Sequence, residues 1–269
     1  SKLKREVKES ILKAKRNGRS MVVEIFDGSI EIIDSYPAIY IPTIDSIVIS
    51  DLHLGYERIM SERGVFIPEI QFKEEVKALK KIMRIKRAYS IIINGDLKNE
   101  FSPETYHEFE EVSNMLNFLK RNFKRVVVVK GNHDTYIYYV TNRFSVELHD
   151  PYYLEKGFLF THGHKKIEYP KDFHTLIIGH EEPAIVLKEG FDRIKVPVLL
   201  YGKMKNGKNI ICLPAFSILS SGTEINVIEK EEILSPILRE DVDIDELNVV
   251  AIDREVGALN FGKLKNLRI

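Results

Sequence analysis

The chain has 269 residues, 44% of them hydrophobic, and its 40 basic side chains are matched by 40 acidic ones. This length allows a substantial core, and the balanced charge excludes a global basic field for nucleic-acid binding while leaving a local basic patch open. The single cysteine, Cys212, excludes an intrachain disulfide or a thiolate cluster, and no apolar run approaches the roughly 20 residues that span a bilayer. We therefore expect a cytoplasmic protein with no membrane partner, folded as one domain over 1–269.

The N-terminal segment, residues 1–19, is predicted to form a basic amphipathic helix. It lacks the continuous apolar centre of a signal peptide. Because a solvated helix face explains its charge, we assign it no function.

The next part of the chain alternates strands and helices. This order predicts βαβ units with parallel central strands. In chain order, the predicted elements are a hairpin around Asp27-Gly28, a strand at 47–50 (IVIS), a helix over 69–87, a strand at 90–94 (SIIIN), a helix over 103–122 with Ser102 as its cap, and a strand at 126–130 (VVVVK).

After Thr141 the helical signal fades and short strands dominate. A doubly wound first half joined to a strand-rich second half predicts an α/β fold, in which two sheets pack face to face with helices outside. The predicted strands are 143–148, 152–161, 175–179, 184–190, 196–202 and 209–214, with Asn206-Gly207 as a hairpin turn, and then 248–253 and 258–262.

Five apolar runs each end in a residue type that binds metal, although a buried strand has no structural need for Asp, Asn or His at the same end. Ligand sites form at the carboxyl ends of strands in such sheets, which indicates a polynuclear metal centre. Taken singly, Asp-x-His and Gly-Asp are weak signals, because both occur in ordinary turns. The strand-end residues are Asp51 and His53 after IVIS, Asp96 after SIIIN, Asn132 and His133 after VVVVK, His162 after FLF, and His180 after LIIG.

The segment Gly131-Asn132-His133-Asp134 is the most specific of these. Asn is an uncommon metal ligand through its amide oxygen, and the histidine after it points elsewhere, where it is free to donate a proton. A polar loop with Asn in a left-handed turn would give the same letters. Its context among the other strand ends favours the functional interpretation.

The donors number at least seven, which exceeds what one four- to six-coordinate ion requires. Two ions that share a carboxylate are the economical arrangement, and two cations about 3.5–4 Å apart suit in-line displacement at phosphorus. The pattern therefore predicts hydrolysis of a phosphoester. Oxygen and imidazole donors without thiolate favour Mn²⁺, with Fe, Zn or Ni as alternatives.

The series DLHLG, GDLKNEF, KGNHD, THGHK and GHEEPA, over residues 51–184, resembles the five-motif signature of the calcineurin-like metallophosphoesterases. Outside it, LPAFSILSSGTEIN and AIDREVGALNFGKLKNL resemble small archaeal phosphoesterases related to SbcD, akin to the bacterial ligase-associated phosphoesterases. The resemblance covers nearly all of the chain after the N-terminal helix. It implies a four-layer αββα sandwich of two mixed β-sheets flanked by helices, with a binuclear metal site.

The resemblance also implies roles for single residues. Asp96 would bridge the two ions, and His133 would protonate the leaving alkoxide. One metal would take Asp51, His53 and Asp96, and the other would take Asp96, Asn132, His162 and His180.

One position departs from the family pattern, whose last motif usually reads Gly-His-x-His. Glu182 stands where the second His is expected. We predict that its carboxylate ligates the first metal and favours Mn²⁺ over Zn²⁺; the alternative is that it points away and weakens that site. His164 is predicted to contact substrate, with a role behind the ligands or a plain loop position as alternatives. Asn99 lies where protein phosphatases keep the Asp that partners the proton donor, so the sequence does not explain the orientation of His133.

Two classes of function fit these residues. The favoured one is a metal-dependent phosphodiesterase or nuclease that acts on DNA, other nucleic acid or nucleotides. The competing one is a scaffold that kept the fold and lost turnover, and a phosphomonoesterase or protein phosphatase is a further alternative. Retention of His133 argues for the enzyme, because a scaffold needs no proton donor. The sequence leaves a homo-oligomer open.

Overall fold

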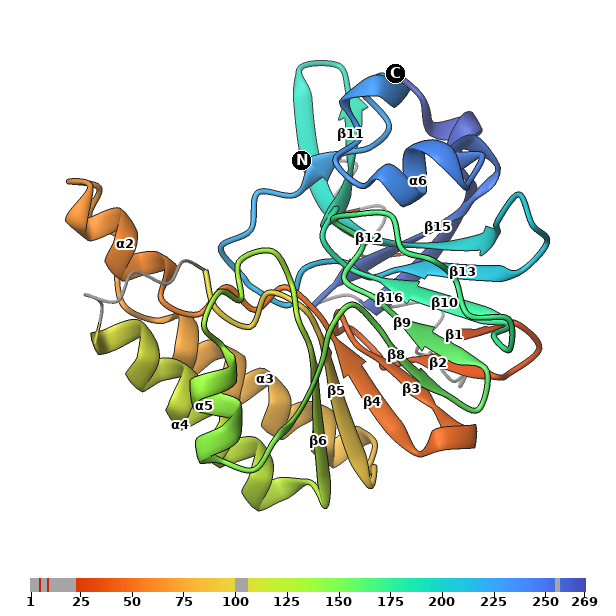
Figure 1. Cartoon of the computed structure of the whole chain (residues 1–269). Coiled ribbons are helices and arrows are strands. Elements are labelled where there is room, and N and C mark those ends of the chain that lie inside the picture. The colour runs from red at the N-terminus through yellow and green to blue at the C-terminus, as the bar shows by residue number, and fades with distance from the viewer. Residues whose placement is uncertain (1–4, 6–8, 10–22, 100–105, 255–256) are drawn as a thin grey trace.

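The first of two β-sheets carries the first three ligand motifs (Figure 1). The structure, a computed structural model, describes Arg5, Glu9 and residues 23–99, 106–254 and 257–269. In spatial order this sheet contains β1 (Val23–Ile25), β2 (Ile30–Ile32), β3 (Ile39–Ile41), β4 (Ser46–Ile49), β5 (Ser90–Asn94), β6 (Arg125–Val129) and β7 (Glu147–His149). The strands from β1 to β4 pair antiparallel, and those from β4 to β7 pair parallel. The carboxyl ends of β4, β5 and β6 therefore meet at one edge.

The second sheet faces the first. In spatial order it contains β14 (Thr223–Glu224), β11 (Pro183–Glu189), β12 (Asp192–Lys203), β13 (Asn209–Cys212), β10 (Thr175–Ile178), β9 (Phe158–Phe160) and β8 (Tyr153–Glu155), with β15 (Asn248–Asp253) on β12 and β16 (Gly257–Lys263) on β15. Strand β10 is parallel to both β9 and β13. The carboxyl ends of β9 and β10 thus also lie side by side. Asn206-Gly207 forms the predicted turn between the antiparallel strands β12 and β13.

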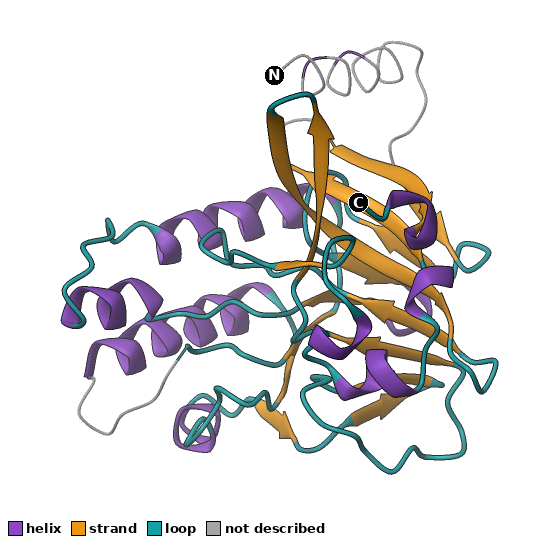
Figure 2. Cartoon of the chain, turned by 90° about the horizontal axis from the view of Figure 1, so that it is seen from above, coloured by secondary structure: helices purple, strands orange, loops and turns teal. Residues whose placement is uncertain are grey.

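Helices complete the outer layers (Figures 1 and 2). The α-helices are α2 (Tyr56–Glu62), α3 (Gln71–Ile85), α4 (Tyr106–Asn122), α5 (Tyr138–Arg143) and α6 (Pro236–Glu240), and the 3-10 turns are η1 (Pro42–Ile44), η2 (Lys230–Glu232), η3 (Ile244–Glu246) and η4 (Leu264–Leu267). Helices α3, α4 and α5 pack on the outer face of the first sheet, and α6 with η3 and η4 packs on the second.

Three apolar clusters lie between these four layers. Strand β5 shows how the sequence builds them. Ile91 and Ile93 face the helices, whereas Ile92 faces the second sheet, because successive side chains of a strand point to opposite faces. A strand buried on both faces must be apolar throughout, which explains its uninterrupted run. The predicted two-sheet α/β sandwich flanked by helices is confirmed.

Some predicted elements differ from those in the structure. The strand expected at 143–148 is wrong in its first half, because α5 continues to Arg143 and β7 begins only at Glu147. Ser145 adopts a left-handed conformation (φ 52°), and Val146 N–H bonds the Thr141 carbonyl, so a helix-ending motif occupies this stretch. The short helices α2 and α6 were not predicted.

Two predictions fall largely on residues that the structure does not describe. These are the helix over 1–19, of which only Arg5 and Glu9 are described, and the Ser102 cap of α4. Across the described ranges, no helix combines the length and apolarity needed to cross a bilayer.

Candidate metal centre

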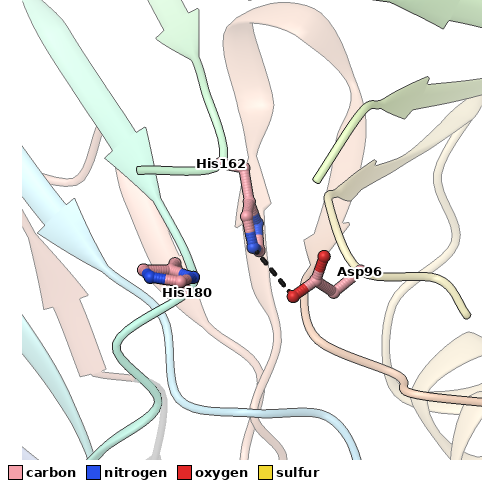
Figure 3. A group of neighbouring side chains, drawn as sticks. All are labelled: Asp96, His162 and His180. Atoms are coloured by element: carbon pink, nitrogen blue, oxygen red, sulfur yellow. Dashed lines mark ion pairs between the residues drawn. The ribbon is translucent and has the colours of Figure 1, made fainter. Parts of the chain in front are cut away.

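The strand-end donors gather where the carboxyl edges of the two sheets meet. Two groups of side chains each place three ligand atoms within 4.8 Å of one another. One contains Asp96, His162 and His180, shown in Figure 3, and the other contains Asp51, His53 and Glu182. Six of the seven predicted metal ligands are thus brought together, from both sheets.

In the first group, hydrogen bonding fixes the orientation of His162. Its Nδ1 donates to the backbone carbonyl of Asn94 at 2.9 Å, so Nδ1 is turned away from the centre and Nε2 is the nitrogen that would bind a metal ion there. Nε2 lies 3.0 Å from Asp96 Oδ2 (Figure 3). The ring of His180 packs against that of His162, with centroids 5.2 Å apart.

In the second group, Asp51 has one bonded and one unbonded oxygen. Its Oδ2 accepts from Ser50 Oγ at 2.5 Å and from the backbone N–H of His180 at 3.0 Å. Its Oδ1 is buried with no hydrogen-bond partner among the described residues. That oxygen lies 3.8 Å from Nε2 of His53 and 3.8 Å from Nε2 of His162. A buried carboxylate oxygen without a donor is expected where a cation binds.

Glu182 points into the centre rather than away from it. Its Oε1 lies 2.5 Å from His53 Nε2, and its Oε2 accepts from Ser220 Oγ at 2.5 Å. The backbone N–H of Gly222 donates to Ser220 Oγ at 3.2 Å, which leaves the hydroxyl proton for Glu182. Ser220 therefore fixes the carboxylate through Oε2, with Oε1 directed toward the position of a metal ion.

The two groups do not identify which carboxylate would be shared by the two ions. Asp96 lies with His162 and His180, and the oxygen that reaches imidazoles of both groups belongs to Asp51. Bridging by Asp96 stays a prediction.

Mutual attraction sets the protonation of the imidazoles. Burial alone would lower the pKa of His162, but the neighbouring Asp96 and Asp51 raise it to about 10. Burial lowers the pKa of His53, but the hydrogen bond to Glu182 and the charges of the nearby carboxylates together raise it to about 9. Protons on these rings do what a bound cation would do, which is to neutralise the carboxylates. Metal binding would release them, as it must wherever imidazole becomes a ligand.

The other two histidines near this point are neutral. Burial, with a further contribution from His162, lowers the pKa of His180 and of His164 to about 4 each. A neutral imidazole is the form that ligates. The ring of His164 lies 5.4 Å from that of His162, and its Nδ1 is buried without a partner in the described part of the chain. His164 therefore lies beside the first group, and substrate contact stays a prediction.

His133 stands next to the second group. Its ring is edge-on to that of His53, with centroids 5.3 Å apart. Its Nδ1 bonds the backbone carbonyl of Asn99, and its backbone N–H donates to Asp96 Oδ1 at 3.0 Å. The backbone carbonyl of Asn99 thus takes the place of the Asp side chain that partners the proton donor in protein phosphatases. Asn132 lies beside His133 with an exposed side chain, so its place among the ligands stays a prediction.

Two glycines allow the ligands to pack this closely. A Cβ on Gly95 would lie 2.1 Å from His162 Nδ1, and one on Gly131 would lie 2.2 Å from Asp96 Oδ1. Gly95 thus leaves room for a ligand from the other sheet, and Gly131 for a ligand from the neighbouring strand β5.

Sequence reasoning missed the residues that hold the ligands. Ser50 and Asn94 carry a detectable signal, because each is a buried polar residue at the end of an apolar strand. Ser220 carries none, because its partner Glu182 is 38 positions away.

A cavity of about 240 Å³ opens beside the second group. It is lined by His53, Tyr56, Asn99, His133, Glu182, Ser217, Leu219, Ser220 and Ser221. The rings of His53 and His133 share this cavity, so a bound molecule could contact a metal ligand and His133 together.

Comparisons with known proteins agree with this architecture. Among solved structures, Pseudomonas putida nuclease MPE is similar over 88% of this chain and 98% of that chain, with 18% identity and a TM-score of 0.62. Yfce, a phosphoesterase from E. coli, is matched over 66% of this chain and 83% of its own, with 20% identity and a TM-score of 0.37. At 18% identity, the similarity to nuclease MPE shows that this chain has the same fold.

No curated protein matches the sequence. A family model described as calcineurin-like phosphoesterase matches residues 46–214, which is more than half of the chain and includes both ligand groups. The chain therefore belongs to the calcineurin-like phosphoesterase family.

Proposed function

We propose that the chain is a metal-dependent phosphodiesterase that cleaves nucleic acid or nucleotides. Family membership makes it a hydrolase of ester bonds. The observation that carries the proposal is the buried, unbonded Oδ1 of Asp51, which lies 3.8 Å from an imidazole of each ligand group. One of these imidazoles, that of His53, contacts the ring of His133. This arrangement suits two cations with a proton donor at their side.

Two divalent metals fit the donor set. Asp51, His53 and Glu182 would hold one, and Asp96, His162 and His180 the other, with Asn132 as a further ligand. When bound, such ions stabilise charge on the attacking and leaving oxygens at phosphorus. Three carboxylates with three imidazoles favour Mn²⁺, with Fe, Zn or Ni as alternatives.

His133 is proposed as the proton donor. Because the Asn99 carbonyl can only accept, Nδ1 must carry a proton. In the doubly protonated ring, Nε2 carries the second proton, and this is the proton that would pass to the leaving oxygen. The contact with His53 holds the ring at the cavity wall. The substrate would place its leaving group there.

A diester of nucleic acid is proposed for two reasons. The chain's closing segments resemble SbcD-related phosphoesterases, and the fold is that of a protein named a nuclease. We also propose that 1–269 forms one domain. A non-catalytic scaffold is the competing function.

Leaving-group chemistry provides a sharp test. We expect Mn²⁺-dependent hydrolysis of bis-p-nitrophenyl phosphate and of a thymidine dinucleotide. His133→Ala should lower kcat on the dinucleotide by about 10²–10⁴-fold, the usual contribution of general acid catalysis. The loss on the nitrophenyl ester should be smaller, because p-nitrophenolate leaves without protonation.

His149→Ala is the matched control, since His149 contacts Glu147 and Tyr153 and belongs to neither ligand group. It should leave both rates unchanged. Equal losses on the two substrates in His133→Ala would remove the proton-donor role. No hydrolysis with any of the four metals would favour the scaffold.

A further inference from the structure

Three exposed tyrosines follow the His133 loop. Tyr136, Tyr138 and Tyr139 are 49%, 44% and 56% exposed, and we call them the tyrosine platform. The rings of Tyr138 and Tyr139 lie 4.0 Å apart between centroids, and those of Tyr136 and Tyr139 are nearly parallel, with 24° between their planes. Neighbouring aromatic rings with exposed faces are typical of ligand-binding surfaces.

Hydrogen bonds and core packing hold the backbone of the tyrosine platform in place. Asp134 anchors its start, because its Oδ2 accepts from the backbone N–H groups of Asp96 at 2.9 Å and Gly131 at 2.8 Å. Ile137 and Val140, which alternate with the tyrosines, are each 1% exposed and belong to the core. The buried residues thus fix the backbone from which the tyrosine rings face outward.

One tyrosine is held at a conformational cost. Tyr136 has a φ of 61°, in the left-handed region that bulky side chains avoid. Such strain persists only where the surroundings impose it, and it concentrates at functional sites.

The platform is close to the proposed chemistry. Tyr136 is three residues from His133, so their Cα atoms are at most about 11 Å apart. Lys130, which directly precedes this loop, and Lys165 lie 3.9 Å and 4.0 Å from the two oxygens of Asp150, so two ammonium groups share one carboxylate. A nucleic-acid strand bound along the loop would contact an ammonium group, His133 and the rings.

We propose that the tyrosine platform stacks unpaired nucleobases beside the scissile phosphodiester, which makes single-stranded nucleic acid the substrate class. This inference rests on the proposed function. Stacking requires a free base face, which a duplex does not offer, and it tolerates any sequence because every base has such a face. The exposed rings beside the loop of the proton donor match that requirement.

Binding measurements with and without bases test the platform. Fluorescence anisotropy of a labelled oligothymidylate would be measured in a His133→Ala background with Mn²⁺, which slows turnover. Tyr139→Ala should weaken binding by about 10-fold, the scale of one base–aromatic stack. Binding of an abasic strand of equal length should not change, because that strand has no base to stack. Tyr139→Phe should bind both strands as the parent does.

Two further variants separate stacking from folding. Tyr89 is 55% exposed and precedes β5, at the opposite end of that strand from Asp96, so Tyr89→Ala is the matched control and should bind normally. Tyr136→Asn should weaken oligothymidylate binding while its Tm stays equal to or above that of the parent, because Asn tolerates the left-handed region.

Three results would overturn the proposal. They are unchanged oligothymidylate affinity in Tyr139→Ala, an equal loss for the abasic strand, and conversion of an oligomer to a monomer by Tyr139→Ala, which would make the platform a subunit interface. Hydrolysis of bis-p-nitrophenyl phosphate by the chain without substitutions tests the proposed function separately. If the ester is cleaved and the platform variants bind normally, only the present inference fails.

Discussion

Hydrogen bonds to the far sides of the candidate metal ligands direct their other donor atoms toward the centre. Ser50 holds one oxygen of Asp51 and leaves the other unbonded, and the Asn94 carbonyl fixes the tautomer of His162. Ser220 holds Oε2 of Glu182, whose Oε1 bonds His53. Such outer contacts orient ligands and tune their affinity for metal.

The Ser220 contact gives a prediction about metal affinity. Ser220→Ala removes the donor behind Glu182, so the carboxylate loses its fixed orientation beside His53. We expect Mn²⁺ affinity at one of two sites to fall about 10–100-fold by isothermal titration calorimetry. Ser220→Thr, which keeps a hydroxyl, should restore it.

Ser221→Ala is the matched control, because Ser221 lines the same cavity. It should leave both affinities unchanged. A Ser220→Ala chain that binds Mn²⁺ as the parent does would show that Glu182 needs no support from Ser220 or does not ligate.

At the level of elements, helix α3 begins without a cap of its own. Its N-cap residue Ile70 makes no side-chain hydrogen bond, and a carboxylate from α2 takes over. Glu57 Oε1 accepts from the backbone N–H groups of Ile70 at 3.0 Å and Gln71 at 2.6 Å. The helix next to the metal centre is thus started by a residue 13 positions earlier.

Removing this distant cap should destabilise the fold. Glu57→Ala leaves two N–H groups at the start of α3 without their acceptor, and we expect a loss of about 1–2 kcal/mol in urea unfolding. Glu62→Ala, an exposed position on the same helix α2, should change the free energy of unfolding by less than about 0.5 kcal/mol. Equal effects of the two substitutions would mean that Glu57 does not cap α3.

Periodicity predicted the long elements and failed for the short ones. Strands such as β5 and β6 are continuous apolar runs, and α3 has an apolar stripe over four turns, so the pattern alone identifies them. Helices α2, α5 and α6 have 7, 6 and 5 residues, which is too short for a helical period to emerge. Contacts distant in sequence, such as the Glu57 cap, decide where these segments form.

Across the whole molecule, the candidate metal centre lies between the two sheets. Asp51 and Asp96 follow strands of the first sheet, and His162 and His180 follow strands of the second. The sequence predicted which residues end the strands, because each motif is local. It could not predict how the two sheets meet, because the contacts that join the sheets link residues far apart in the chain.

Asn94 makes the most direct link between the two sheets. Its Nδ2 donates to the carbonyls of Thr161 at 3.1 Å and Ile177 at 2.9 Å, in the second sheet, while its own carbonyl holds His162. Asn94→Ala would leave the buried Thr161 carbonyl without this donor, and the Ile177 carbonyl would keep only the Thr161 N–H. The loss of these two buried hydrogen bonds should lower the free energy of unfolding by about 1–3 kcal/mol.

Ser90 lies at the other end of β5, is equally buried and serves as the control. Ser90→Ala should cost less than about 1 kcal/mol, because it removes no link between the sheets. Urea unfolding measures both variants without metal. Repeating it with Mn²⁺ should stabilise the parent chain more than Asn94→Ala, because a ligand stabilises the folded state according to its affinity, and the Asn94 side chain holds the backbone of Thr161, the residue before His162. If the two variants unfold at the same urea concentration, the sheets are joined by apolar packing and not by this amide.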